Sequence, residues 1–262
     1  MKRLILCLLA AAMLLTGCGL VPASQSGTTQ PSDTTTATET TVDTTLEALT
    51  AYENVLLDFY EKHLSPDGQE LVIDNEIFGH IEENSFAVAD VDGDGSEELV
   101  LVFSTAPMAG MCLWICGYNG KTGSVYQELS VFPNVTFYSD GLIEAGWSHN
   151  QGLAGDVLWP YTLMKYDPDA RSYQTLAQVD AWDKNLRDTD YDGNPFPDDV
   201  DTEGTGAVYL ITEIIDRIPT TPKSLSRTDY ETWRTGIMGN AAPMELEYLA
   251  TTLDNIHAVS PE

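Results

Sequence analysis

The stretch Phe86–Phe103, FAVADVDGDGSEELVLVF, decides the fold of this chain. Two apolar runs, residues 86–89 and 99–103, flank a short segment made almost entirely of acidic residues and glycine. Apolar runs of this length, bounded by turn-forming residues, are typical of buried strands, and two of them so close together predict an antiparallel hairpin. We therefore expect a β-sheet to form around this hairpin.

The segment between the two runs carries carboxylates at a regular spacing. Counted from Asp90, positions one, three, five and nine are the acidic residues Asp90, Asp92, Asp94 and Glu98. Calcium prefers hard oxygen ligands, so these side chains, with the carbonyl oxygen of Ser96 at position seven, predict a calcium-binding loop. Four carboxylates held this close repel one another unless a cation neutralises them. We expect the calcium ion to be structural.

The pattern D-x-D-G-D-G-x-x-E-L over residues 90–99 resembles the calcium loops of FG-GAP and VCBS-type repeats. In that family the loop joins two adjacent antiparallel strands. The resemblance implies the same five ligands, with Gly93 and Gly95 serving the turn. The loop departs from an EF-hand because position twelve is Leu101, where an EF-hand needs a bidentate carboxylate.

A second acidic segment matches the EF-hand template at positions one, three, five, six and twelve. Its candidate ligands are Asp188, Asp190, Asp192, Asn194 and Asp199. Pro195 and Pro197 count against a second metal site, because proline removes backbone donors inside the loop. The alternative is an acidic surface loop without a cation, and the continued acidity of residues 198–203 favours it.

The first 17 residues have the features of a signal peptide. Lys2 and Arg3 precede an apolar run, residues 4–15, that is too short for an ordinary membrane span. The run ends in Leu15-Thr16-Gly17-Cys18, which resembles a bacterial lipobox. This resemblance implies cleavage before Cys18 and a diacylglyceryl anchor of the palmitate type on that cysteine. The alternative is an ordinary secretory signal followed by a chance cysteine.

The sequence predicts three parts along the chain. Residues 1–17 form the signal peptide, and residues 18–45, rich in threonine and serine with few apolar side chains, form a lipidated, disordered tether. Residues 46–262 are long enough for one β-rich domain with its own core. We therefore expect an extracytoplasmic, cell-surface protein anchored by lipid to the outer face of the bacterial cytoplasmic membrane.

The chain is strongly acidic, with 41 Asp and Glu against 12 Lys and Arg and a net charge of −29. This charge argues against binding nucleic acid and favours divalent cations as partners. The lipobox, the tether and the Asp90 loop together resemble acidic lipoproteins of gut Firmicutes, most of which have no defined activity. The resemblance therefore bears on location and metal binding, while an envelope protein or glycan partner and the oligomeric state stay open.

The predicted fold is mainly β (α+β), an antiparallel meander similar to propeller blades or a curved open sheet. Strands are expected near residues 71–73, 86–90, 98–104, 111–118, 125–132, 142–147, 159–166 and 172–180. An amphipathic helix should run from Leu46 to before Ser65. A short helix is expected after Ser226, which begins a Ser-x-x-Asp capping pattern, and another within residues 244–256. Residues 207–218 are a strand or a helix, with a strand favoured for the first half.

Two cysteines of the predicted domain, Cys112 and Cys116, lie in one apolar segment. In a strand, residues four apart at about 3.3 Å each have Cα atoms roughly 13 Å apart, beyond the approximately 7 Å limit for a disulfide. We expect buried free thiols. A metal or redox site is the alternative, but the sequence offers no second cysteine or histidine cluster.

Familiar hydrolase signatures, such as G-x-S-x-G and H-E-x-x-H, are absent from residues 18–262. Ser148, His149 and Asp156 offer the groups of a nucleophilic site, yet adjacent side chains of a strand point to opposite faces. Enzymatic activity is therefore uncertain and disfavoured.

Three aromatic residues, Trp147, Trp159 and Tyr161, could stack on sugars, although such residues mostly fill the core of a meander. The alternative to a calcium-binding scaffold is thus an envelope carbohydrate-binding protein or hydrolase.

Overall fold

The computed structural model describes residues 44–148 and 152–260 of the chain. Within these residues the strands form two antiparallel sheets, so the mainly β fold class is confirmed. The predicted signal peptide, Cys18, the tether up to residue 43 and His149 lie outside the described residues. No helix among the described residues is long and apolar enough to cross a membrane.

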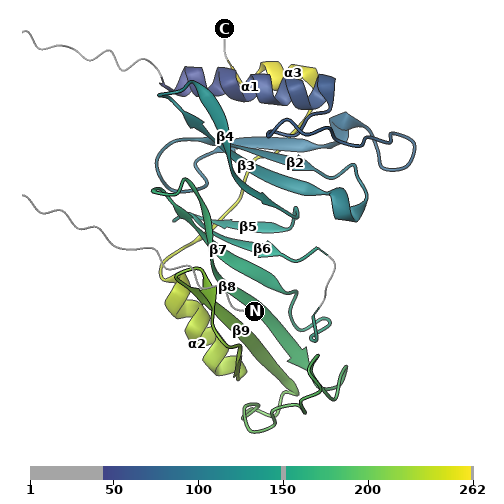
Figure 1. Cartoon of the computed structure of the whole chain (residues 1–262), viewed down its shortest axis with the longest axis vertical. Helices are drawn as coiled ribbons and strands as arrows, with labels where there is room; N and C mark the ends of the chain where they lie inside the picture. Colours follow the sequence, from purple (N-terminus) through teal and green to yellow (C-terminus); the bar gives the residue numbers. More distant parts are fainter. Residues whose placement is uncertain (1–43, 149–151, 261–262) are drawn as a thin grey trace, which may run out of the picture. The chain divides into compact units, whose positions relative to one another are not determined.

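The first sheet is built on the predicted hairpin (Figure 1). Its strand order is β13-β1-β2-β3-β4. The strands are β1 (Ser85–Ala89), β2 (Glu98–Phe103), β3 (Cys112–Asn119), β4 (Ser124–Val131) and β13 (Leu249–Ala250). Four of them are consecutive in the sequence, so this sheet is a meander to which one C-terminal edge strand is added.

The second sheet is also a meander of consecutive strands, with order β10-β9-β8-β7-β6-β5-β12 and β11 paired to β9. Its main strands are β5 (Val135–Tyr138), β6 (Leu142–Gly146), β7 (Tyr161–Asp167), β8 (Ser172–Asp183) and β9 (Ala207–Ile215). Shorter strands at its margins are β10 (Ile218–Pro219), β11 (Lys223–Leu225) and β12 (Pro243–Met244).

Helix α1 (Thr44–Lys62) packs on the first sheet. Tyr52, Leu56 and Phe59 recur at helical spacing and are buried in one cluster with residues of β1, β2 and β3. The short helix α3 (Leu253–His257) contributes Ile256 to the same cluster. α1 begins two residues before the predicted start, which is the usual uncertainty at helix ends.

A second cluster lies between the two sheets, because it contains buried side chains from both. Val100 of β2 and Ile115 of β3 meet Phe137 of β5 and Ile143 of β6 there. The neighbouring residues of β2, such as Leu101, belong instead to the α1 cluster, so this strand is buried on both faces. Burial on both faces explains why its sequence is a continuous apolar run.

Helix α2 (Arg227–Met238) packs on the second sheet (Figure 1). Ser226 caps it, since its Oγ accepts a hydrogen bond from the Asp229 amide at 3.1 Å, as the Ser-x-x-Asp pattern predicts. Tyr230 and Met238 are buried against β6, β7, β8 and β9. The helix covers the face of this sheet that does not meet the first sheet.

The structure corrects three of the predicted elements. Residues 71–73 form no strand, and Val72 is 79% exposed. A three-residue apolar run is too short to form a strand without a partner strand beside it. β5 was missed because it has only four residues and depends on pairing with β6 and β12. The predicted helical turns over residues 244–256 are confined to α3, since β13 lies before it.

Candidate metal site

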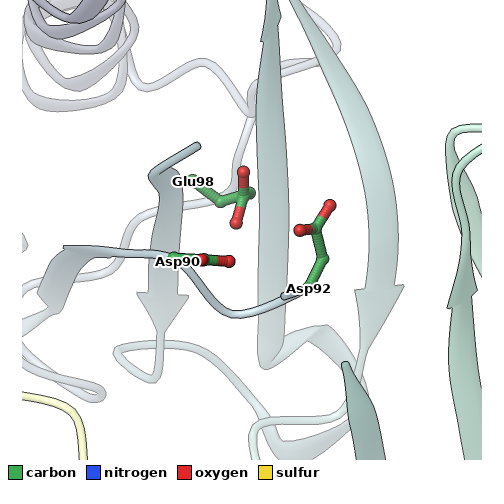
Figure 2. Close-up of side chains that lie close together, drawn as sticks. All are labelled: Asp90, Asp92 and Glu98. Atoms are coloured by element: carbon green, nitrogen blue, oxygen red, sulfur yellow. The ribbon is translucent and has the colours of Figure 1, made fainter. Parts of the chain in front are cut away.

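The hairpin ends bring the first and last candidate ligands together. Ala89 and Glu98 are the last paired residues of β1 and β2, so Asp90 leaves the ladder directly beside Glu98. Figure 2 shows the carboxylates of Asp90, Asp92 and Glu98 lying close together. One carboxylate oxygen from each lies within 4.8 Å of the other two. Among the residues that the structure describes, no other group of three or more His, Cys, Asp or Glu side chains meets this limit.

The glycines turn the chain around this group. Gly93 has φ of 80° and Gly95 has φ of 91°, a left-handed region in which residues with a Cβ are strained. The turn aims both of their amides at Asp90, with Gly93 N donating to Oδ1 at 2.8 Å and Gly95 N to Oδ2 at 3.1 Å. The Asp94 amide donates to Asp92 Oδ1 at 2.8 Å. The loop therefore orients the carboxylates through its own backbone.

Two of the three carboxylates are buried. Asp92 is 6% exposed and Glu98 is 2% exposed, whereas Asp90 is more open. Glu98 Oε2 accepts a hydrogen bond from the Val91 amide at 3.0 Å, but Asp92 Oδ2 is buried and makes no hydrogen bond of good geometry. The Tyr166 hydroxyl nearby lowers the pKa of Asp92 but does not offset its burial. A buried carboxylate oxygen without a partner is costly, so a cation is the partner that this geometry suits.

Burial and the nearby negative charges raise the pKa values of Asp92 and Glu98. Burial, with a further contribution from Asp92, raises the pKa of Glu98 to about 9. Burial also raises the pKa of Asp92 to about 6, and the charges of Asp94 and Asp90 add to this rise. Without a cation the cluster therefore holds protons that a divalent ion would displace on binding.

Residues of the second sheet and of α1 support the loop from outside the hairpin. The Tyr173 hydroxyl of β8 donates to the Val91 carbonyl at 3.0 Å. Gly141, in the turn between β5 and β6, has φ of 76°, and a Cβ at this position would overlap the carbonyl of Asp92. On the α1 side, the Tyr52 hydroxyl donates to the Glu97 carbonyl at 2.8 Å. The sequence analysis missed these three residues, which have no local signal of a metal site.

A fourth buried acid, Glu128 of β4, was also missed. It is 5% exposed, and neither of its carboxylate oxygens makes a hydrogen bond of good geometry, although the hydroxyls of Tyr126 and Tyr166 lie close enough to lower its pKa. Burial, followed by the charge of Asp92, raises the pKa of Glu128 to about 8. Pairing with β3 shifts from Leu129 to Gln127 at adjacent positions, so Glu128 is the extra residue of a β-bulge. A bulge turns a side chain that simple alternation would place elsewhere.

Of the other two predicted ligands of the loop, the Asp94 carboxylate lies outside the three-carboxylate group. Asp94 and Ser96 are exposed, and the Ser96 amide donates to Asp94 Oδ1 at 2.7 Å. Their part in metal binding stays a prediction.

The second acidic loop has a different geometry. Its candidate ligands, apart from half-buried Asp190, are exposed. The Asp190 carboxylate accepts hydrogen bonds from the amides of Asp192 at 2.9 Å and Asn194 at 2.8 Å, and from the Asn194 side chain at 2.8 Å. The structure does not bring Asp188, Asp190, Asp192 and Asp199 into a close group. The loop's own groups satisfy the Asp190 carboxylate, and a cation there stays a prediction.

A cavity of about 650 Å³ lies beside the first loop. The segment Asp94–Glu98 forms one wall, and Tyr52, Tyr118 and Tyr126 line the rest together with the start of α1. The conformation of the loop therefore sets the shape of a pocket.

The remaining predicted residues are accounted for as follows. Cys112 and Cys116 are free thiols, as expected, with Cys116 buried and Cys112 half-buried. Trp159 and Tyr161 line one pocket on the second sheet, and Trp147 lies next to it. Because His149 is outside the described residues, the nucleophilic alternative with Ser148 and Asp156 is not tested.

No family model, curated protein or solved structure matches this chain. The resemblance to FG-GAP loops and to lipoproteins therefore stays a prediction from the motifs alone. The case for a metal depends on this site itself, and its donor set fits one: three convergent carboxylates, two of them buried, with one unpartnered oxygen. Oxygen donors of this kind suit calcium, magnesium and manganese.

Proposed function

We propose that this protein binds calcium at the loop between β1 and β2. Asp90, Asp92 and Glu98 would hold the ion, and Asp94 and the Ser96 carbonyl are the further ligands that the loop pattern predicts. The observation that carries the proposal is the group of three convergent carboxylates, in which the buried Asp92 Oδ2 makes no hydrogen bond of good geometry.

Calcium is preferred to magnesium for two reasons. Calcium accepts six to eight oxygen ligands in a flexible arrangement, which an eight-residue loop with several carboxylates and carbonyls can supply. Magnesium demands near-octahedral geometry and keeps much of its water, so two buried carboxylates suit it less. The spacing of the acids in the loop is also the one that resembles calcium-binding repeats.

The proposed role of the ion is structural. It would neutralise carboxylates that otherwise repel one another and would fix the segment Asp94–Glu98, which is a wall of the 650 Å³ cavity. The protein would then act as a scaffold or binding module whose pocket is shaped by calcium. Extracellular calcium is usually millimolar, so even a weak site would be mostly filled outside the cell.

We further propose that the protein is lipid-anchored through Cys18 at the outer face of the cytoplasmic membrane. The support is the lipobox pattern and the composition of residues 18–45. Expression in a bacterial host with Cys18→Ala as the comparison tests it. The wild-type chain should fractionate with membranes and gain the mass of a lipid, and the variant should do neither. Equal fractionation without a lipid mass would contradict the anchor.

Isothermal titration of calcium into chelator-treated protein tests the metal proposal. We expect one saturable event that Asp92→Asn abolishes, with magnesium binding at least about tenfold more weakly. Asp190→Asn is the matched variant in the second loop and should leave that event intact. A second event lost only in Asp190→Asn would add a second calcium. Binding unchanged in Asp92→Asn, or absent from the wild type, would refute the proposal.

A further inference from the structure

A second pocket, of about 320 Å³, lies where β5 and β6 of the second sheet meet α2. None of the candidate calcium ligands lines it. Its lining combines aromatic and hydrogen-bonding side chains, of which the principal ones are Asn134, Thr136, Glu144, Trp159, Tyr161 and Arg234. The volume falls within the range of small-molecule sites.

The aromatic part of this pocket is held in place. Trp159 is 41% exposed although it is large and apolar, and its indole Nε1 donates to the Trp147 carbonyl at 2.8 Å. That bond satisfies the indole's only donor and ties the ring to the residue directly after β6. Tyr161 is buried beside it, and its hydroxyl lies 3.0 Å from the Tyr230 hydroxyl of α2. An exposed but anchored tryptophan is a surface prepared for stacking.

The polar part of the pocket is electrically neutral. Arg234 Nη2 lies 2.6 Å from Glu144 Oε1 and also donates to the Tyr138 hydroxyl at 3.1 Å. These two charges pair with each other, and the other lining side chains are uncharged. The chain as a whole carries a net charge of −29, so a neutral pocket is a local exception.

A neutral pocket excludes two classes of ligand. An anion could pair with Arg234 only by displacing Glu144, and a cation could pair with Glu144 only by displacing Arg234. Either exchange breaks a half-buried ion pair and leaves one of its charges unpaired. A neutral ligand rich in hydroxyl groups avoids this cost. Its hydroxyls can both donate and accept, and so match the adjacent donor and acceptor of the pair, the Asn134 amide and the Thr136 hydroxyl.

We propose that this pocket binds a neutral saccharide, with one sugar ring stacked on Trp159. Its hydroxyl groups would bond to the side chains of Glu144, Arg234, Asn134 and Thr136. The aliphatic face of a pyranose offers the apolar surface that an indole needs, while its edge offers the hydroxyls. The site is independent of the calcium loop, so either proposal can hold without the other.

The test is a titration of the purified protein, in calcium, with cellotetraose, maltotetraose and chitotetraose as neutral probes. Sialyllactose and tetragalacturonate are the acidic probes. Isothermal titration and tryptophan fluorescence should show saturable binding of at least one neutral tetrasaccharide up to about 10 mM, and none of the acidic sugars. Trp159→Ala should weaken that binding by at least about tenfold.

Two further variants keep the test decisive. Thr136→Val, on an exposed position of β5, keeps the side-chain shape and should weaken binding without affecting the fold. Tyr248→Ala removes an aromatic side chain of equal exposure, 42%, outside the pocket and should leave binding unchanged. Failure of all neutral probes to bind, binding of acidic sugars alone, or equal affinity in Trp159→Ala and the wild type would overturn the proposal.

Discussion

The Asp92→Asn substitution should stabilise the protein without calcium and remove most of its response to calcium. The Asp92 carboxylate is 6% exposed and has an unpartnered oxygen, and its pKa is raised from 3.8 to about 6. A folded-state pKa above the unfolded value means that keeping Asp92 ionised at pH 7 destabilises the folded protein, here on the order of 2 kcal/mol after allowance for partial screening.

Asparagine removes this cost. Its amide keeps an acceptor for the Asp94 amide, which donates to Asp92 Oδ1, and its NH2 group can donate to the carboxylates of Asp90 or Glu98. The calcium-free variant should therefore melt about 4 to 8 °C above the calcium-free wild type, since 1 kcal/mol corresponds to about 2–4 °C for a domain of this size.

Calcium should cancel most or all of this difference. For a site with Kd of about 0.1–1 mM, about 10 mM calcium stabilises the wild type by roughly 1.4–2.7 kcal/mol, or about 3–10 °C. The variant, which lacks one ligand charge, should gain little from calcium. The difference between the calcium responses of the two proteins is therefore the informative quantity.

Differential scanning calorimetry in chelator and in calcium measures all four melting temperatures. Asp169→Asn removes the same charge from an exposed turn and should respond to calcium as the wild type does. The reasoning fails if Asp92→Asn lowers the melting temperature in chelator, which would make Asp92 a structural acceptor, or if its calcium response equals that of the wild type.

Three further predictions concern the same loop. The folded-state pKa of Glu98 is raised from 4.5 to about 9, so the calcium-free protein should lose stability as pH rises from about 5 to 9. Calcium should reduce this loss, and melting curves at several pH values would show both effects. Gly141→Ala should abolish the calcium response in titration, because a Cβ there overlaps the Asp92 carbonyl. The control is Gly68→Ala, at φ of 82° with open space around it, which should only lower the melting temperature. Tyr173→Phe removes the bond to the Val91 carbonyl and should cost about 1 kcal/mol in denaturant unfolding and weaken calcium binding several-fold; unchanged values would show that this bond does not position the loop.

The hairpin and its turn could be predicted because their causes are local. Two apolar runs, glycines with positive φ and acids at alternate positions are all visible within the stretch Phe86–Phe103. The capped helix after Ser226 was equally visible, since one serine and one aspartate specify its start. Elements whose stability comes from long-range pairing, such as the four-residue strand β5, gave no comparable signal.

The residues that hold the candidate site in place could not be predicted, for the same reason. Tyr173 and Gly141 lie far from the loop in the sequence and reach it only because the second sheet packs there. Glu128 lies in a strand whose alternation is broken by a bulge, and a bulge follows from pairing with β3, not from the residues of β4 alone. Sequence patterns therefore identify ligands better than they identify what holds the ligands in place.

The position of the loop determines what a calcium ion there would do for the whole domain. Its proposed ligands all come from the β1–β2 hairpin, but Tyr173 and the turn at Gly141 bring the second sheet against the backbone of Val91 and Asp92. An ion that fixes this backbone would also fix the surface on which the second sheet packs. The free energy of calcium binding would then stabilise the contact between the two sheets as well as the hairpin. On this basis calcium should raise the cooperativity of unfolding, and calorimetry should show a ratio of van't Hoff to calorimetric enthalpy closer to one in calcium than in chelator.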